Sequence, residues 1–191
     1  MRMMLICGAL VALAACQKPG QENTVANEAA STEQAGPVKG VDRSHASKPA
    51  PDPTFKDPNG EDTTLAGFSG KPVLVNLWAT WCAPCVKELP TIDRLAQAQD
   101  KNGGLQIAAI SQDSGPHRSV IAFLDSHKIE KLAAYQDEKM SLSGAMGAEV
   151  LPTTILFDAK GREVWRYVGD LDWTSPEAAK LLAEAGAKKP G

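Results

Sequence analysis

The sequence has little of three things: cysteine, aromatic side chains and net charge. Only 5% of its 191 residues are aromatic, and four are cysteines. A net charge of −3 argues against nucleic-acid binding through bulk charge. Because aromatic residues are so few, the core should be mainly aliphatic, and the length suits one domain with appendages. The bulky exceptions are Trp78, Trp81, Trp165 and Trp173.

The cysteines are Cys7, Cys16, Cys82 and Cys85, and only the last two lie close together in the sequence. A structural zinc site needs four thiolate or imidazole ligands, and the pair supplies two. Covalent haem attachment needs a histidine after the second cysteine, where this chain has Val86. The Cys-x-x-Cys spacing therefore favours a redox-active pair over a metal site, and we expect no cofactor and no metal.

The pair lies between an expected strand and an expected helix. The apolar run 72–79 is typical of a buried strand, and residues 86–99 carry apolar side chains at helical spacing. At such a junction the helix dipole lowers a thiol pKa from about 8.5 to about 3.5–7.5. We expect Cys82 to be the nucleophilic thiolate, and Cys85, one turn further on, to close or resolve the disulfide.

The segment Val75 to Pro90 resembles the thioredoxin-like family of TlpA and ResA. The likeness continues through residues 151–158, Gly161-Arg162 and the turn 57–60, and it covers residues 54–185. This resemblance implies an α/β, thioredoxin-like fold, with a mixed central sheet flanked by helices. It also implies an N-terminal β-hairpin and the central insertion of TlpA-like proteins.

The N-terminus has the pattern of a secretion signal. Residues 1–15 contain one positive charge, a short apolar centre and small residues at the end, and they are too short to span a bilayer. The sequence Leu13-Ala14-Ala15-Cys16 resembles a bacterial lipoprotein signal, which implies that Cys16 is lipidated after cleavage. The alternative is ordinary cleavage with Cys16 left as a free thiol. Gln17, where Asp would signal inner-membrane retention, makes the outer membrane the default expectation.

Residues 16–53 are polar and cannot bury a core, so we expect a lipid-anchored flexible linker followed by a thioredoxin-like domain over 54–187. Pro90 lies inside the active-site helix and should kink it. The elements expected in the domain are a hairpin over 55–64, strands over 73–79, 105–110, 132–136, 153–158 and 163–168, and helices over 86–99, 119–128, 141–148 and 175–185.

A base is needed for Cys85, because a buried second thiol has a raised pKa. Thioredoxins place a buried Asp in this strand, but here Asn76 stands at the matching position and is expected to be a buried, hydrogen-bonded amide. Glu88 matches a glutamate that ResA-like proteins carry after their cysteine pair. The resemblance therefore assigns proton handling to Glu88, and the alternative is a solvated helix glutamate.

The resemblance also implies a substrate-binding surface made of Trp81, Leu151 and Pro152, with a cis Leu151–Pro152 bond opposite Cys82. It implies a periplasm-facing thiol-disulfide oxidoreductase that reduces protein disulfides, such as those of apocytochrome c or metal-site assembly proteins. A membrane electron donor would regenerate it. Two alternatives remain open: a copper-binding chaperone that uses the same two sulfurs, and a peroxiredoxin-like peroxidase.

Overall fold

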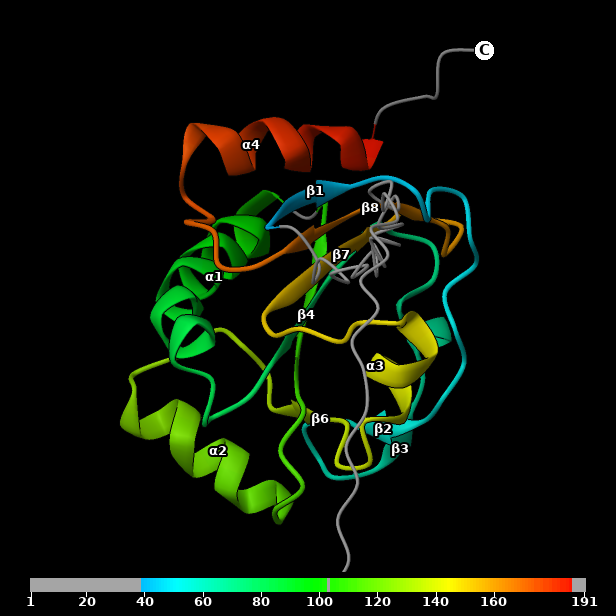
Figure 1. Cartoon of the computed structure of the whole chain (residues 1–191). Coiled ribbons are helices and arrows are strands. Elements are labelled where there is room, and N and C mark those ends of the chain that lie inside the picture. Colours follow the sequence, from blue (N-terminus) through cyan, green and yellow to red (C-terminus); the bar gives the residue numbers. More distant parts are fainter. Residues whose placement is uncertain (1–38, 103, 187–191) are drawn as a thin grey trace, which may run out of the picture. The chain divides into compact units, whose positions relative to one another are not determined.

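The structure is a computed structural model that describes residues 39–102 and 104–186 (Figure 1). The expected signal peptide, the expected lipidation site Cys16 and most of the expected linker lie outside the described residues. An eight-stranded mixed sheet has the strand order β1-β8-β7-β4-β5-β6-β2-β3. The strands are β1 (Gly40–Asp42), β2 (Phe55–Lys56), β3 (Asp62–Thr63), β4 (Val73–Trp78), β5 (Gln106–Ser111), β6 (Tyr135–Gln136), β7 (Thr153–Phe157) and β8 (Glu163–Val168).

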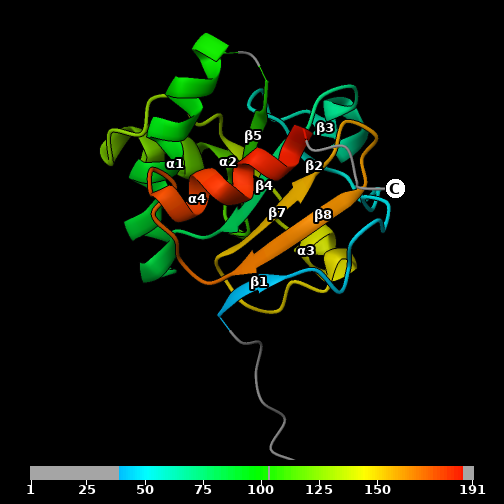
Figure 2. The same cartoon turned by 90° about the horizontal axis from the view of Figure 1, so that it is seen from above.

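Helices cover both faces of this sheet, which confirms the predicted thioredoxin-like α/β fold (Figure 2). The side chains of α1, α2 and α4 pack in one apolar cluster, and those of α3 pack in the other. The helices are α1 (Ala83–Asn102), α2 (His117–Ser126), α3 (Ser141–Met146) and α4 (Pro176–Leu182), with 3-10 turns at Leu65–Phe68 and Ala183–Gly186. Within the described residues no helix is long and apolar enough to cross a membrane.

Strand β4 is the centre of the sheet, and all six of its residues are buried. Successive side chains of a strand point to opposite faces. Leu74 and Trp78 accordingly join the cluster under α1, whereas Val75 and Leu77 join the cluster under α3. A strand buried on both faces has a continuous apolar run, which is why the sequence showed it so clearly.

The pairing register decides which loops meet. Leu77 in β4 pairs with Thr153, Thr153 pairs with Val168, and Val168 pairs with Gly40. Because these neighbouring strands are antiparallel, the residues after β4, those before β7 and those before β1 all lie beyond the same ends of the strands. In this sense they share one edge of the sheet. That edge carries the cysteine pair.

The predicted linker extended too far. Its residues 40–42 form β1, an antiparallel edge strand along β8, and Pro49 forms a bridge with Arg162. An edge strand is held mainly by backbone pairing and does not need an apolar face. Of the three residues of β1, only Val41 packs against the core. Composition therefore could not reveal β1. Helix α1 begins at Ala83, three residues earlier than the apolar spacing indicated, and it contains Pro90 as expected.

Candidate active site

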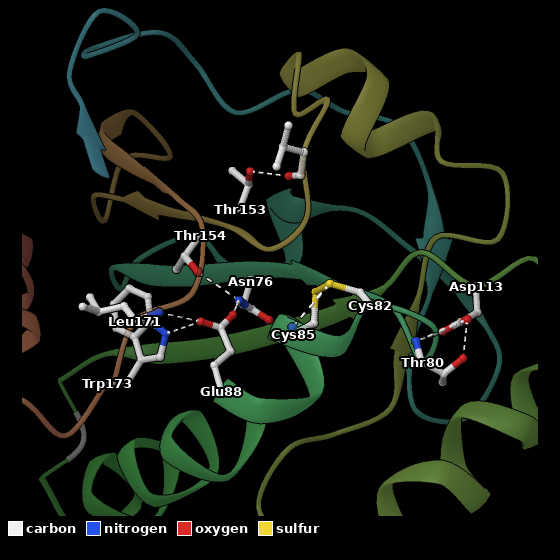
Figure 3. Close-up of a disulfide and its surroundings, with 11 residues drawn as sticks. Asn76, Thr80, Cys82, Cys85, Glu88, Asp113, Thr153, Thr154, Leu171 and Trp173 are labelled. Atoms are coloured by element: carbon white, nitrogen blue, oxygen red, sulfur yellow. Dashed lines mark hydrogen bonds between the residues drawn. A yellow bond between two sulfur atoms is a disulfide. The ribbon is translucent and has the colours of Figure 1, made fainter. Parts of the chain in front are cut away.

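Cys82 and Cys85 form a disulfide where β4 leads into α1 (Figure 3). The S–S distance is 2.08 Å and the Cα–Cα distance is 5.2 Å. Cys82 lies just before the first residue of α1, as the sequence predicted, and its backbone N–H donates to Ala79 O at 3.1 Å. The backbone N–H of Cys85 points to Cys82 Sγ at 3.3 Å.

The two cysteines differ in access to solvent. Cys82 has an exposed fraction of 6%, whereas Cys85 is fully buried. Trp81, directly before the pair, is 68% exposed, which is unusual for so large an apolar side chain. The small part of the pair that reaches solvent therefore belongs to Cys82, which directly follows the exposed Trp81.

Glu88 is buried one turn after Cys85, so the alternative of a solvated glutamate is wrong. Its Oε1 accepts from Asn76 Nδ2 at 2.8 Å, and its Oε2 accepts from the Leu171 N–H at 3.1 Å and from Trp173 Nε1 at 3.3 Å. Burial raises the pKa of Glu88 from 4.5 to about 7, against the lowering effect of these hydrogen bonds. A carboxyl with this pKa can exchange a proton near neutral pH.

Asn76 is the buried amide that the sequence predicted. Besides Glu88, its Nδ2 donates to Thr154 Oγ1 on β7 at 2.9 Å. Oδ1 of Asn76 has no hydrogen-bond partner. The amide thus joins the central strand to the active-site helix and to β7.

The Leu151–Pro152 peptide bond is cis, as predicted. Pro152 directly precedes β7, at the same sheet edge as the residues that follow β4, and its carbonyl accepts from the Gly169 N–H at 2.9 Å. Val150 beside it is 36% exposed, and its carbonyl accepts from Thr153 Oγ1 at 2.6 Å. The segment is therefore fixed at the edge that carries the disulfide.

A family model described as Redoxin matches residues 45–182. This chain belongs to the Redoxin family. The thiol-disulfide oxidoreductase ResA of Bacillus thuringiensis (strain Al Hakam) is 32% identical over 123 residues, which cover 64% of this chain and 69% of ResA. The thiol:disulfide interchange protein DsbE of Pseudomonas fluorescens biotype C is 34% identical over 146 residues, covering 73% and 79% of the two chains.

Solved structures agree with this assignment. A Chlorobium tepidum protein assigned as a thiol:disulfide interchange protein DsbE matches with a TM-score of 0.64 and 27% identity, over 74% of this chain and 98% of that one. The Cys82–Cys85 pair has the spacing and the disulfide of a redox centre. The chain is therefore a thiol-disulfide oxidoreductase similar to ResA and TlpA.

A carboxylate that the sequence analysis missed holds the active-site loop of this Redoxin-family protein. Asp113, just after β5, accepts from the Thr80 N–H at 3.0 Å and from Thr80 Oγ1 at 2.7 Å. It also accepts from Ser111 Oγ at 2.6 Å, and its own carbonyl accepts from Gln136 Nε2 at 2.6 Å. An acidic residue two positions after the end of β5, which the sequence predicted as a strand, was the one signal in the sequence that could have indicated it.

A second unpredicted contact involves the loop 169–173, in which Leu171 and Trp173 donate hydrogen bonds to Glu88. Lys39 Nζ binds Asp170 Oδ1 at 2.6 Å, and its aliphatic stem covers Gly169. Gly169 has φ +96°, a conformation that favours glycine. The next two residues are Asp170 and Leu171, whose N–H donates to the Glu88 carboxylate. Lys39, at the start of the described chain, thus helps to fix a donor of the active site.

Proposed function

We propose that this oxidoreductase reduces disulfide bonds in proteins outside the cytoplasm, with Cys82 as the attacking thiolate. The observation that carries the proposal is the difference in access between the two cysteines, because Cys82 keeps an exposed fraction of 6% whereas Cys85 is fully buried. Cys82 also lies at the N-terminus of α1, where the helix dipole favours an anion. The N–H of Cys85 at 3.3 Å from Cys82 Sγ adds a donor for the thiolate.

The reaction starts from the reduced dithiol. Cys82 attacks one sulfur of the substrate disulfide, and the other substrate sulfur leaves as a thiolate and takes up a proton. Cys85 then loses its proton and attacks Cys82, which releases the second substrate thiol and forms the disulfide seen here. Two electrons pass from the cysteine pair to the substrate, whose two sulfurs take up two protons; these balance the proton that Cys82 gives up when it becomes the thiolate and the proton that Cys85 loses in the second step.

Glu88 takes the proton of Cys85 in the second step. Its burial and its pKa of about 7 support this role. A general base works best when its pKa lies near the operating pH, and at neutral pH part of Glu88 is the carboxylate that can accept a proton. Asn76, Leu171 and Trp173 hold it in place through three hydrogen bonds. The position of Asn76 lacks the carboxylate that thioredoxins have there, so Glu88 is the base.

The substrate lies on the exposed apolar surface around the disulfide. Trp81 and Val150 are exposed by 68% and 36%, whereas Leu151 is half-buried and Pro152 is buried, so the exposed apolar side chains are those of Trp81 and Val150. Apolar residues exposed beside a reactive group are typical of a surface that binds an extended, unfolded peptide. By the resemblance to TlpA and ResA, apocytochrome c and metal-site assembly proteins are the substrates that we propose.

Delivery depends on the part of the sequence before residue 39. Residues 1–15 act as a signal peptide, lipid on Cys16 holds the protein at a membrane facing the periplasm, and a membrane dithiol donor reduces the Cys82–Cys85 disulfide after each turnover. Gln17 favours the outer membrane. A free thiol at Cys16 and a soluble protein are the outcome if ordinary cleavage occurs.

Trapping the mixed disulfide tests the direction and the nucleophile. The reduced Cys85→Ala variant is incubated with a peptide that carries a Cys-x-x-Cys-His disulfide, and the Cys82→Ala variant is the matched control. We expect a covalent complex through Cys82 in the first variant only, and turnover of the peptide by the unmodified protein. Tight Cu(I) binding without turnover would instead support the copper-binding alternative.

A further inference from the structure

The interior beside the disulfide contains a hydrogen-bond acceptor without a donor. Asn76 is fully buried in the middle of β4, and its Oδ1 is unpaired. Buried polar atoms almost always have a partner, and an exception needs a physical explanation. In the part of the chain that the structure describes, three further buried side-chain atoms share this condition: Trp78 Nε1, Gln112 Oε1 and Gln136 Oε1.

The direction of this oxygen is fixed by the other end of the amide. Both hydrogens of Asn76 Nδ2 are used, one by Glu88 Oε1 at 2.8 Å and one by Thr154 Oγ1 at 2.9 Å. Oδ1 must therefore point away from these two residues. Figure 3 shows Asn76 between Glu88 and the disulfide, with its oxygen on the side of Cys85.

The disulfide explains why this oxygen has no donor. In the oxidised protein the Cys85 sulfur is bonded to Cys82 and carries no hydrogen. Reduction adds two electrons and two protons to the disulfide, and one of these protons makes the Cys85 sulfur an S–H donor. Cys85 is fully buried. We propose that Asn76 Oδ1 is the hydrogen-bond acceptor for the Cys85 thiol in the reduced protein.

This contact makes Asn76 a positioning residue for the reaction. In the reduced protein the amide joins the Cys85 thiol on one side to the Glu88 carboxylate on the other. A carbonyl oxygen stabilises the protonated thiol, and an amide N–H stabilises the carboxylate. Asn76 thus keeps Cys85 protonated while Cys82 is the thiolate, and keeps Glu88 ionised and ready to accept the proton.

The contact also distinguishes the two redox states. Only the reduced protein gains the hydrogen bond, so Asn76 favours the dithiol over the disulfide. Neutral hydrogen bonds in proteins have net values that correspond to about a five-fold change in an equilibrium constant. Because a stabilised dithiol raises the reduction potential of the pair, this hydrogen bond makes the protein a milder reductant than it would be without Asn76.

Carbon NMR of the side-chain amides tests the proposal without any substitution. The protein is studied with its disulfide intact and after reduction by dithiothreitol, and the carboxamide carbon of Asn76 is followed. We expect it to shift on reduction, because Oδ1 gains a donor. The carboxamide carbon of Gln136, whose Oε1 is also buried and unpaired, is the matched control and should stay in place. An Asn76 signal that is the same in both states overturns the inference.

Redox equilibria provide the second test. Asn76→Leu removes the acceptor, whereas Thr154→Val removes a neighbour of the same amide and leaves Oδ1 untouched. Equilibrium with dithiothreitol is measured at about pH 5, where the Glu88 carboxyl, with its pKa of about 7, is protonated. We expect Asn76→Leu to shift the equilibrium about five-fold toward the disulfide. Thr154→Val should leave it unchanged, and equal shifts in both variants contradict the proposal.

The part that Asn76 plays in the reaction rests on the proposed role of Glu88 as the base. The hydrogen bond between Asn76 and the Cys85 thiol can nevertheless be present when that role of Glu88 is wrong, and the reverse also holds. The NMR experiment detects the Cys85 thiol at Asn76 and does not depend on proton transfer. A shifted Asn76 signal together with normal resolution kinetics in Glu88→Gln would support the inference and contradict the role of Glu88.

Discussion

The Glu88 carboxylate on α1 and the Asn76 amide on the central strand β4 are joined by a buried hydrogen bond of 2.8 Å. This bond ties the active-site helix to the middle of the sheet. Glu88 is one turn after Cys85 on α1, so the same helix carries the thiol and the carboxyl that we propose as its base. The chemistry is therefore built on two rigid elements and not on a loop.

The first prediction concerns resolution kinetics. Glu88→Gln keeps the size of the side chain but cannot accept a proton, so attack by Cys85 on the mixed disulfide should slow by about a hundred-fold. The wild-type rate should rise with pH around 7, where Glu88 ionises, and this rise should be absent in the variant. Stopped-flow measurement of mixed-disulfide decay across pH provides the readout. Wild-type kinetics in Glu88→Gln at every pH would contradict it.

The same group predicts how stability depends on pH. Burial raises the pKa of Glu88 from 4.5 to about 7, so the folded protein binds this proton more tightly than the unfolded chain. Stability from this group is fully present below about pH 4.5 and is lost as pH rises to about 7, by about 3 kcal/mol. Denaturant unfolding of the oxidised protein should show this decline, and Glu88→Gln should lack it.

The sequence predicted the elements with local signals and missed those that depend on distant partners. The apolar run of β4 and the Cys-x-x-Cys spacing are local, and they located Cys82 correctly at the start of α1. Strand β1 exists because β8 offers a free edge, which composition cannot show. Asp113 holds Thr80 from 33 residues away, and only the parallel pairing of β4 with β5 brings them together.

The second prediction follows from the contact between Asp113 and Thr80. Asp113→Ala leaves the N–H and hydroxyl of Thr80 and the hydroxyl of Ser111 without an acceptor, and should cost about 2–3 kcal/mol. Because Thr80 precedes the cysteine pair, disulfide reduction should slow as well. Asp158→Ala is the matched control, since Asp158 accepts from backbone N–H groups in the β7–β8 turn. Asp158→Ala should lose stability, but its folded molecules should reduce disulfides at the wild-type rate. Equal rates in both variants would show that Asp113 is only structural.

A third prediction concerns Gly169. A Cβ at this position would lie 2.9 Å from Lys39 Cγ, and its φ of +96° disfavours other residues. Gly169→Ala should cost about 1–2 kcal/mol and displace Lys39 from Asp170. Gly144→Ala offers the contrast, because it lies in α3 with no atom within 4 Å of an added Cβ, and should stabilise the helix by about 1 kcal/mol. Thermal unfolding of both variants checks the opposite signs.

A fourth prediction concerns delivery. Cys16→Ser removes the proposed lipidation site, and the protein should move from the membrane fraction to the soluble fraction after cell lysis. Gln17→Asp keeps the cysteine and should shift the protein toward the inner membrane, as the sorting rule for the following residue implies. Membrane flotation followed by immunodetection measures both. Continued membrane association of Cys16→Ser would exclude lipid on Cys16 as the anchor.

The last prediction separates binding from folding at two tryptophans close together in the sequence. Trp78 is fully buried at the end of β4, so Trp78→Ala should cost about 3–5 kcal/mol of stability. Trp81 is 68% exposed, so Trp81→Ala should change stability by less than about 0.5 kcal/mol. If Trp81 binds the substrate, KM for a protein disulfide should rise by about ten-fold, while reduction by dithiothreitol stays the same. Ile121→Ala, which alters another exposed apolar residue on α2, controls for loss of exposed apolar surface. A rise in KM for Trp81→Ala but not for Ile121→Ala assigns the effect to the surface beside Cys82, and an unchanged KM removes Trp81 from the substrate site.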